Sequence, residues 1–225
     1  MQDQTTRPQT TALRTGNLYL VAGVVMSTLA LIFIGDPISH NLLQENGIIE
    51  TASALGYLLC ILLVVALRPS WPLSQTWPFL VILAFMCLRE LDMDKSAFTL
   101  GFLKARQYTS DAVSLPEKLI SIAILLLILS SVVAVIKRHG KPLLNGILNG
   151  SPHHLSVGLG IFFVLSSKLL DGINRKLSGL GLQVSADAEN WALVYEEVAE
   201  LGIAVAFALA ILTLKLNARS EVTAP

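Results

Sequence analysis

The chain has 225 residues, of which 53% are hydrophobic and only 14% are charged, and its mean hydropathy is +0.65. This composition excludes an ordinary soluble domain and predicts a protein that crosses a membrane several times. The formal net charge is zero and no basic stripe with interleaved aromatic residues occurs, which excludes nucleic acid as a partner. Cys60 and Cys87 lie in apolar runs without a Cys-x-x-Cys spacing, so neither a disulfide framework nor a zinc ribbon is predicted.

The apolar runs predict an all-α fold with six transmembrane helices in one membrane domain, residues 17–214. The polar residues 1–16 are expected to form a disordered N-terminal tail, and residues 215–225 a C-terminal tail. Between the third and fourth helices, residues 96–115 are predicted to form an interfacial helix, and a basic loop is expected at 137–141. The expected membrane helices cover residues 17–35, 47–67, 77–88, 116–136, 154–173 and 191–214.

The third of these runs is short and ends in a cluster of charges. Residues 77–88 reach only about 18 Å at 1.5 Å per residue, whereas the hydrocarbon core is roughly 30 Å thick. The charged segment 89–95 is therefore expected inside the membrane, where four charges facing lipid would cost on the order of 10 kcal/mol. These side chains are predicted to face protein or water.

An even number of spans places both termini on the same side of the membrane. We expect the protein in the plasma (inner) membrane with both termini in the cytoplasm. Eight basic residues then lie on the cytoplasmic side and five on the outer side, which is the bias expected for that orientation. The inner set is Arg7, Arg14, Arg68, Lys137, Arg138, Lys141, Lys215 and Arg219, and the outer set is Lys95, Lys104, Arg106, Arg175 and Lys176.

The acidic residues of the predicted spans gather near their outer ends, which indicates a polar site there. Helical spacing places Glu90 with Asp94, and Glu196 with Glu200, on shared faces. Ala204 and Ala208 continue the second row, and small residues there favour the close approach of another helix. The candidate metal ligands are Glu50, Glu90, Asp94, Asp171, Glu196 and Glu200, with Arg89 and Lys168 as counter-charges.

Nine helix-borne acids outnumber five helix-borne bases in this region. Closely placed carboxylates do not all ionise without a cation or raised pKa values, so either a bound ion or protonated acids would resolve the imbalance. Oxygen ligands without histidine suit Mg²⁺ or Ca²⁺ better than Zn²⁺. A structural salt-bridge network is the third interpretation, and no catalytic residue or organic cofactor is indicated.

A weak internal repeat appears when residues 77–136 are laid on 156–215 with a shift of 79. Arg89 then falls on Lys168, Asp92 on Asp171, and Glu117 on Glu196. The pattern predicts two hairpins that arose by duplication.

The function that the sequence favours is a non-catalytic membrane protein whose outward-facing cluster forms a polar network or binds a hard divalent cation or a polar headgroup. One alternative is a metal-dependent enzyme acting on a lipid or polyprenyl headgroup, with Arg89 and Lys168 holding phosphate. Another is an ion-coupled transporter, although the inner halves of the spans offer no ionisable group. Membrane lipid is an expected partner, and a protein partner or a second copy of the chain is a further expectation.

Overall fold

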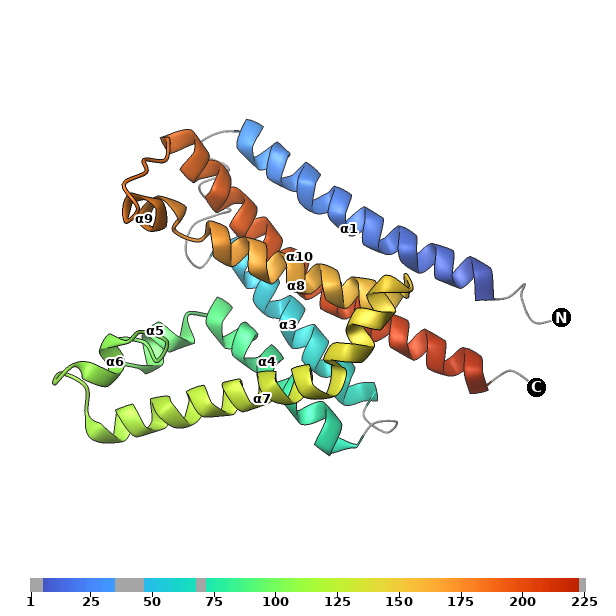
Figure 1. Cartoon of the computed structure of the whole chain (residues 1–225), viewed down its shortest axis with the longest axis horizontal. Helices are drawn as coiled ribbons and strands as arrows, with labels where there is room; N and C mark the ends of the chain where they lie inside the picture. Colours follow the sequence, from blue (N-terminus) through green and yellow to red (C-terminus); the bar gives the residue numbers. More distant parts are fainter. Residues whose placement is uncertain (1–5, 35–46, 68–71, 223–225) are drawn as a thin grey trace. The chain divides into compact units, whose positions relative to one another are not determined.

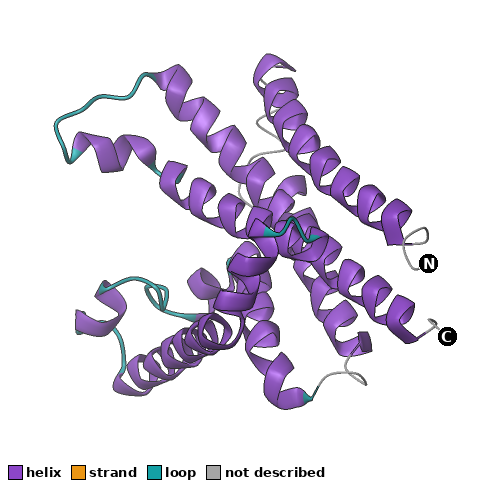
Figure 2. Ribbon diagram, turned by 45° about the vertical axis from the view of Figure 1, so that its right-hand side comes forward, coloured by secondary structure: helices purple, strands orange, loops and turns teal. Residues whose placement is uncertain are grey.

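The computed structural model describes residues 6–34, 47–67 and 72–222, and every regular element within those ranges is helical (Figures 1 and 2). The all-α prediction is therefore confirmed for this part of the chain. The helices are α1 (Thr6–Ile34), α3 (Ile48–Leu67), α4 (Leu73–Glu90), α5 (Met93–Ala97), α6 (Arg106–Thr109), α7 (Leu115–Leu148), α8 (Pro152–Leu170), α9 (Ile173–Ser178) and α10 (Ala186–Val222).

Five of the described helices are long and apolar enough to cross a membrane, which supports a multi-pass membrane protein. The candidate spans are Thr15–Phe33, Ile48–Ala66, Leu115–Leu148, Pro152–Leu170 and Ala186–Leu214. The predicted third span corresponds to α4, which is not among the five. Polar residues occupy both ends of its 18-residue length, so its apolar run is shorter than those of the other helices.

Several helix boundaries differ from those expected from the sequence. Helix α1 begins at Thr6 and so includes most of the segment expected to be a tail, and α10 continues past residue 214 to Val222. The expected basic loop at 137–141 is wrong, because α7 runs through it to Leu148 with Pro142 inside the helix. A helix has no reason to end where it leaves the hydrocarbon, because charged side chains propagate helix readily in water.

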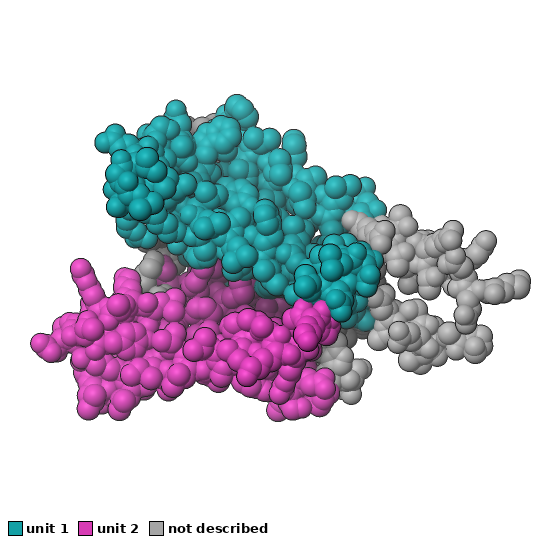
Figure 3. Space-filling model, viewed as in Figure 1, with its two compact units in different colours: residues 1–56, 143–225 teal, residues 57–142 magenta. Residues whose placement is uncertain are grey.

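The chain divides into two compact units, residues 1–56 with 143–225 and residues 57–142 (Figure 3). In the first unit, α1, α8 and α10 lie alongside one another, and α10 is the central helix (Figure 1). More than half of the membrane window of α10, 56%, is buried, against 6% for α1 and 22% for α8. A helix that packs against neighbours on several sides has small apolar residues on those sides, because they allow the other helices to approach closely. Ala199, Ala206 and Ala210 of α10 are buried residues of this kind.

Small residues set the closest helix contacts of this unit. A Cβ placed on Gly56 of α3 would lie 2.7 Å from the Cβ of Ala204 on α10. A Cβ on Gly202 would lie 3.0 Å from Val24 of α1 and 3.2 Å from Phe163 of α8. Ala204 is buried, so the expectation that this small residue admits a neighbouring helix is confirmed.

In the second unit, the segment between α4 and α7 is compact but is not the single interfacial helix expected for residues 96–115. It contains only the end of α5, the four-residue α6, and turns that include Gly101 at φ 85°. Phe102 is buried, with its ring centroid 5.4 Å from that of Phe98 and 6.0 Å from that of Phe85 on α4. Aromatic packing and side-chain hydrogen bonds therefore hold the segment in place of a continuous helix.

Candidate functional site

One ammonium group lies among three carboxylates where α8 ends beside α10. Lys168 Nζ is 3.1 Å from Asp171 Oδ2, 3.7 Å from Glu196 Oε1 and 3.6 Å from Glu200 Oε1. The side chains of Glu196 and Glu200 are 15% and 8% exposed, whereas those of Lys168 and Asp171 are 43% and 42% exposed. This group of four residues, the Lys168 cluster, therefore has two acids inside the helix packing and a base and an acid at its edge.

Helix geometry explains why these four side chains meet. Lys168 lies in the last turn of α8, and Asp171 caps that helix with its backbone N–H donating to Ser167 O at 2.8 Å. The spacing of three residues lets Lys168 donate to the Asp171 carboxylate. Glu196 and Glu200 are four apart, so both project from one side of α10 toward the end of α8. Lys168 thus links two helices through three acids.

Electrostatics around Asp171, which lies just beyond the α8 span, favour its ionised form. Burial raises the pKa of this carboxyl, but the hydrogen bond and charge of Lys168, with the charges of Lys176 and Arg175, outweigh burial and lower the pKa. Lys176 Nζ also donates to the carbonyl of Lys168 at 2.6 Å. The outer edge of the cluster is therefore rich in bases, and its inner side is rich in acids.

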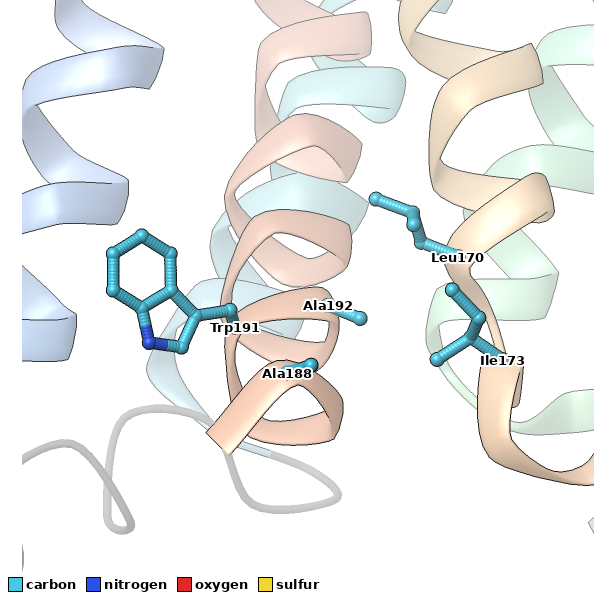
Figure 4. Close-up of a pocket in the computed structure, with 5 residues that line it drawn as sticks. All are labelled: Leu170, Ile173, Ala188, Trp191 and Ala192. Atoms are coloured by element: carbon cyan, nitrogen blue, oxygen red, sulfur yellow. The ribbon is translucent and has the colours of Figure 1, made fainter. Parts of the chain in front are cut away.

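Two further features adjoin the Lys168 cluster. The hydroxyls of Ser166 and Tyr195 are 2.8 Å apart and form a second polar link between α8 and α10. An apolar pocket of about 300 Å³ lies at the start of α10, lined by Leu170, Ile173, Ala188, Trp191 and Ala192. Figure 4 shows Leu170 and Ile173 directed at the α10 face that carries Ala188 and Ala192, while the Trp191 ring projects from another side. Ala192 is one turn before Glu196, so apolar space adjoins the acids.

A second charged group lies at the end of α4, in the other unit. Arg89 Nη2 is 3.1 Å from Glu90 Oε1, and the Glu90 side chain is only 3% exposed. The next acid, Asp92, has the left-handed conformation with φ 49°, which turns the chain from α4 into α5. The side chain of Asp94 lies outside the described residues.

Glu117, at the start of α7, has partners that the sequence did not reveal. Its carboxylate accepts hydrogen bonds from Thr99 N at 2.6 Å, Thr99 Oγ1 at 2.9 Å and Gln107 Nε2 at 2.8 Å. Gln107 is fully buried, and its Oε1 accepts from Leu100 N at 3.0 Å while its Nε2 also donates to Ser121 Oγ at 3.2 Å. Gln107 is an uncharged residue in an irregular segment, so no periodic signal could have identified it.

The structure thus brings together four of the eight predicted site residues, namely Lys168, Asp171, Glu196 and Glu200. Glu50 lies half-buried in the first turn of α3. Glu90 and Glu200 belong to different units, so their membership of one network stays a prediction. Among the side chains that the structure describes, no three His, Cys, Asp or Glu residues form a metal-ligand group. Binding of Mg²⁺ or Ca²⁺ also stays a prediction.

No protein-family model, curated protein or solved structure matches this chain. Function is therefore inferred from the residues themselves. The Lys168 cluster has a cationic side chain among its carboxylates, and this is the arrangement of a charge network that joins helices.

Proposed function

We propose that this chain is a plasma-membrane protein with six transmembrane helices and cytoplasmic termini, and that the Lys168 cluster is an outward-facing polar site without a catalytic role. The eight-to-five bias of basic residues supports the orientation. The five candidate spans supply all but one of the crossings. Helix α4 supplies the sixth crossing.

The observation that carries the proposal is the position of Lys168 within 4 Å of acids on two helices. Charges inside a membrane are costly and pair with one another. Glu196 and Glu200 on α10 therefore favour the packing of α8 that brings Lys168 to them. In this role the cluster stabilises the bundle, and its two exposed side chains, Lys168 and Asp171, are able to contact the polar headgroup of a lipid.

Replacing Lys168 tests the network directly. Lys168→Met should lower the free energy of unfolding by about 1–2 kcal/mol. This cost lies between those measured for exposed and for buried ion pairs, because the Lys168 side chain is 43% exposed. Lys168→Arg should retain most of the stability. Lys168→Met with Glu200→Gln should recover part of the loss, because the stranded charge is also removed. Lys104→Met, an exposed change in the segment between α4 and α7, is the matched control.

Thermal unfolding of purified protein with a chelator, Mg²⁺ or Ca²⁺ distinguishes a network from an ion site. A network predicts that none of these additions changes the midpoint of the wild-type protein. An ion site predicts that the cation raises the midpoint and that Glu200→Gln abolishes this rise. If Lys168→Met costs nothing and no ion acts, the cluster is an ordinary solvated rim and the proposed role is wrong.

A further inference from the structure

A polar pocket lies at the opposite end of α4 from Glu90, within the unit formed by residues 57–142. Its volume is about 370 Å³, and it is lined by Ser74 and Gln75 from the first turns of α4 and by Arg138 and His139 from α7. These four residues, the Arg138 pocket, play no part in the Lys168 cluster. All four carry hydrogen-bonding groups, and one is a permanent cation.

Helix chemistry explains why Arg138 is held there. In α4 the carbonyl of Ser74 would normally accept from the backbone N–H of residue 78, but that residue is proline and has no N–H. Arg138 Nη1 donates to this carbonyl and so replaces the missing bond. A guanidinium has five N–H donors in a planar fork, and this is the one hydrogen bond that it makes to the described residues. The remaining donors of this exposed side chain make no hydrogen bond within the part of the chain that the structure describes.

His139 lines the pocket beside Arg138. Its ring packs on Phe79 with centroids 5.2 Å apart, which fixes the ring on the side of α4. Its Nε2 is buried and has no hydrogen-bond partner among the described residues. The ring of His139 therefore lines the pocket beside the guanidinium of Arg138, while its buried Nε2 is closed off from open space.

The surrounding charge favours an anion. Residues 57–89 and 118–142 contain no Asp or Glu, whereas Lys137, Arg138 and Lys141 lie within two turns of α7. Glu90 is sixteen residues from Ser74 along α4, about 24 Å, and Glu117 is twenty-one residues from Arg138 along α7, about 32 Å. Both separations are far too long for a hydrogen bond or an ion pair with a group in the pocket. Neither acid therefore competes for the pocket.

The position along α7 identifies the kind of anion. Arg138 lies twenty-three residues after Leu115, about 34 Å, which is slightly more than the roughly 30 Å hydrocarbon core. Trp77, one turn into α4, is half-buried and of the type that anchors helices at the interface. The pocket is thus at the level of lipid headgroups. We propose that the Arg138 pocket binds a phosphate group at the membrane surface, supplied by the headgroup of an anionic phospholipid.

The test uses the full-length purified protein and two phosphate sources. Inorganic phosphate is titrated against chloride at equal ionic strength, and the protein is placed in phosphatidylcholine bilayers with or without phosphatidylglycerol. Binding is followed by the rise in the thermal unfolding midpoint and by lipid retained in native mass spectrometry. Stabilisation by phosphatidylglycerol over phosphatidylcholine is the expected result. Stabilisation by inorganic phosphate alone would overturn the lipid assignment, and no effect of either would overturn the site.

Variants separate the pocket from general attraction to basic residues. Arg138→Gln should weaken binding roughly tenfold or more, because a charge-assisted hydrogen bond to phosphate is lost. Lys141→Gln removes the same charge one turn away, at an exposed residue that does not line the pocket, and should change binding no more than about threefold. Equal losses in the two variants would refute a specific pocket.

Arg138→Gln also removes the hydrogen-bond donor of the Ser74 carbonyl. A loss of binding in this variant therefore needs a control that shows the protein is folded. Pro78→Ala restores the backbone N–H that this carbonyl lacks. The double variant Pro78→Ala/Arg138→Gln should therefore unfold at a midpoint near that of the Pro78→Ala protein and still fail to bind. Binding at the wild-type level by the double variant would show that Arg138 is structural only, and the proposal would be wrong.

Discussion

The contact between Gly56 and Ala204 sets how closely α3 approaches α10, one turn from the buried Glu200. A Cβ on Gly56 would lie 2.7 Å from the Cβ of Ala204, whereas two carbons normally approach to about 3.5–4.0 Å. Gly56→Ala thus requires the two helices to separate by roughly 1 Å. Neither methyl group can rotate away, because a Cβ atom is fixed by its own backbone.

Gly56→Ala should destabilise the protein relative to a matched change. Overpacking costs about 1–3 kcal/mol, while the intrinsic preference of a helix for alanine returns about 1 kcal/mol. Gly23→Ala on α1 gains the same preference without a clash, because a Cβ there meets nothing within 4 Å. The two variants should therefore differ by about 1–3 kcal/mol, which corresponds to at least roughly 2 °C in a chain of this size.

The chain contains its own reporter of unfolding. Cys60 has no exposed surface, so a thiol-reactive fluorophore added to a Cys87→Ala protein in detergent reacts as the structure opens. Ala204→Gly removes the opposing methyl, and the double variant Gly56→Ala/Ala204→Gly should be more stable than the sum of the single changes predicts. Additive effects of the two changes, or equal midpoints for Gly56→Ala and Gly23→Ala, would refute the close contact.

Three other substitutions test single contacts in the same assay. Gln107→Leu should cost about 1–3 kcal/mol and increase amide exchange at Leu100, because a part-buried backbone N–H loses its acceptor. The lowered pKa of Asp171 makes its stabilising effect complete above the ordinary value of 3.8. The advantage over Asp171→Asn should therefore decline as the pH falls below 3.8 and vanish below the lower folded pKa. Tyr195→Phe should cost about 1 kcal/mol through the lost bond to Ser166, at unchanged pH dependence.

The sequence predicted the contacts that follow helical periodicity. Lys168 with Asp171, and Glu196 with Glu200, are three and four residues apart, and such residues share a face whatever surrounds the helix. The cost of charge in a membrane then required those faces to meet. These two general rules predicted half of the candidate site without knowledge of how the helices cross.

Contacts made by irregular segments could not be predicted in this way. Glu117 receives its hydrogen bonds from Thr99 and Gln107, eighteen and ten residues earlier. Their position depends on the path of the chain through Gly101, whose positive φ has no periodic signature. Likewise, the bond from Arg138 to Ser74 depends on a proline in a different helix. Pairs of this kind are decided by tertiary packing alone.

The proposed duplication gains a parallel in local structure. Helix α4 ends at Glu90, Asp92 has φ 49°, and the short α5 follows; α8 ends at Leu170, Gly172 has φ 58°, and the short α9 follows. The shift of 79 would place the second left-handed residue at 171, one residue earlier than observed. Both hairpins thus have a long helix, then a residue in the left-handed conformation, then a short helix. A common origin of the two hairpins stays a prediction.

Whether the protein has six crossings depends on α4. Its 18 residues span about 27 Å, slightly less than the roughly 30 Å hydrocarbon core. A mismatch of a few ångströms costs only fractions of a kcal/mol per ångström, because the bilayer thins and charged side chains at the ends reach the interface. Arg89 at one end of α4 is suited to that role, and the other end carries the polar residues Ser74 and Gln75, which tolerate the interface. We therefore expect α4 to cross.

Cysteine labelling decides between six crossings and five. In a protein with both native cysteines replaced by alanine, Gln75→Cys and Ala112→Cys introduce exposed thiols on either side of α4. If α4 crosses, a membrane-impermeant maleimide added to intact cells labels Ala112→Cys, and labels Gln75→Cys only after the membrane is opened. Five crossings would place both thiols on one side and the two termini on opposite sides, so tags at the termini give an independent answer. Labelling of both cysteines from outside would show that α4 does not cross the membrane. Arg89 and Glu90 would then no longer be expected on the same side of the membrane as the Lys168 cluster.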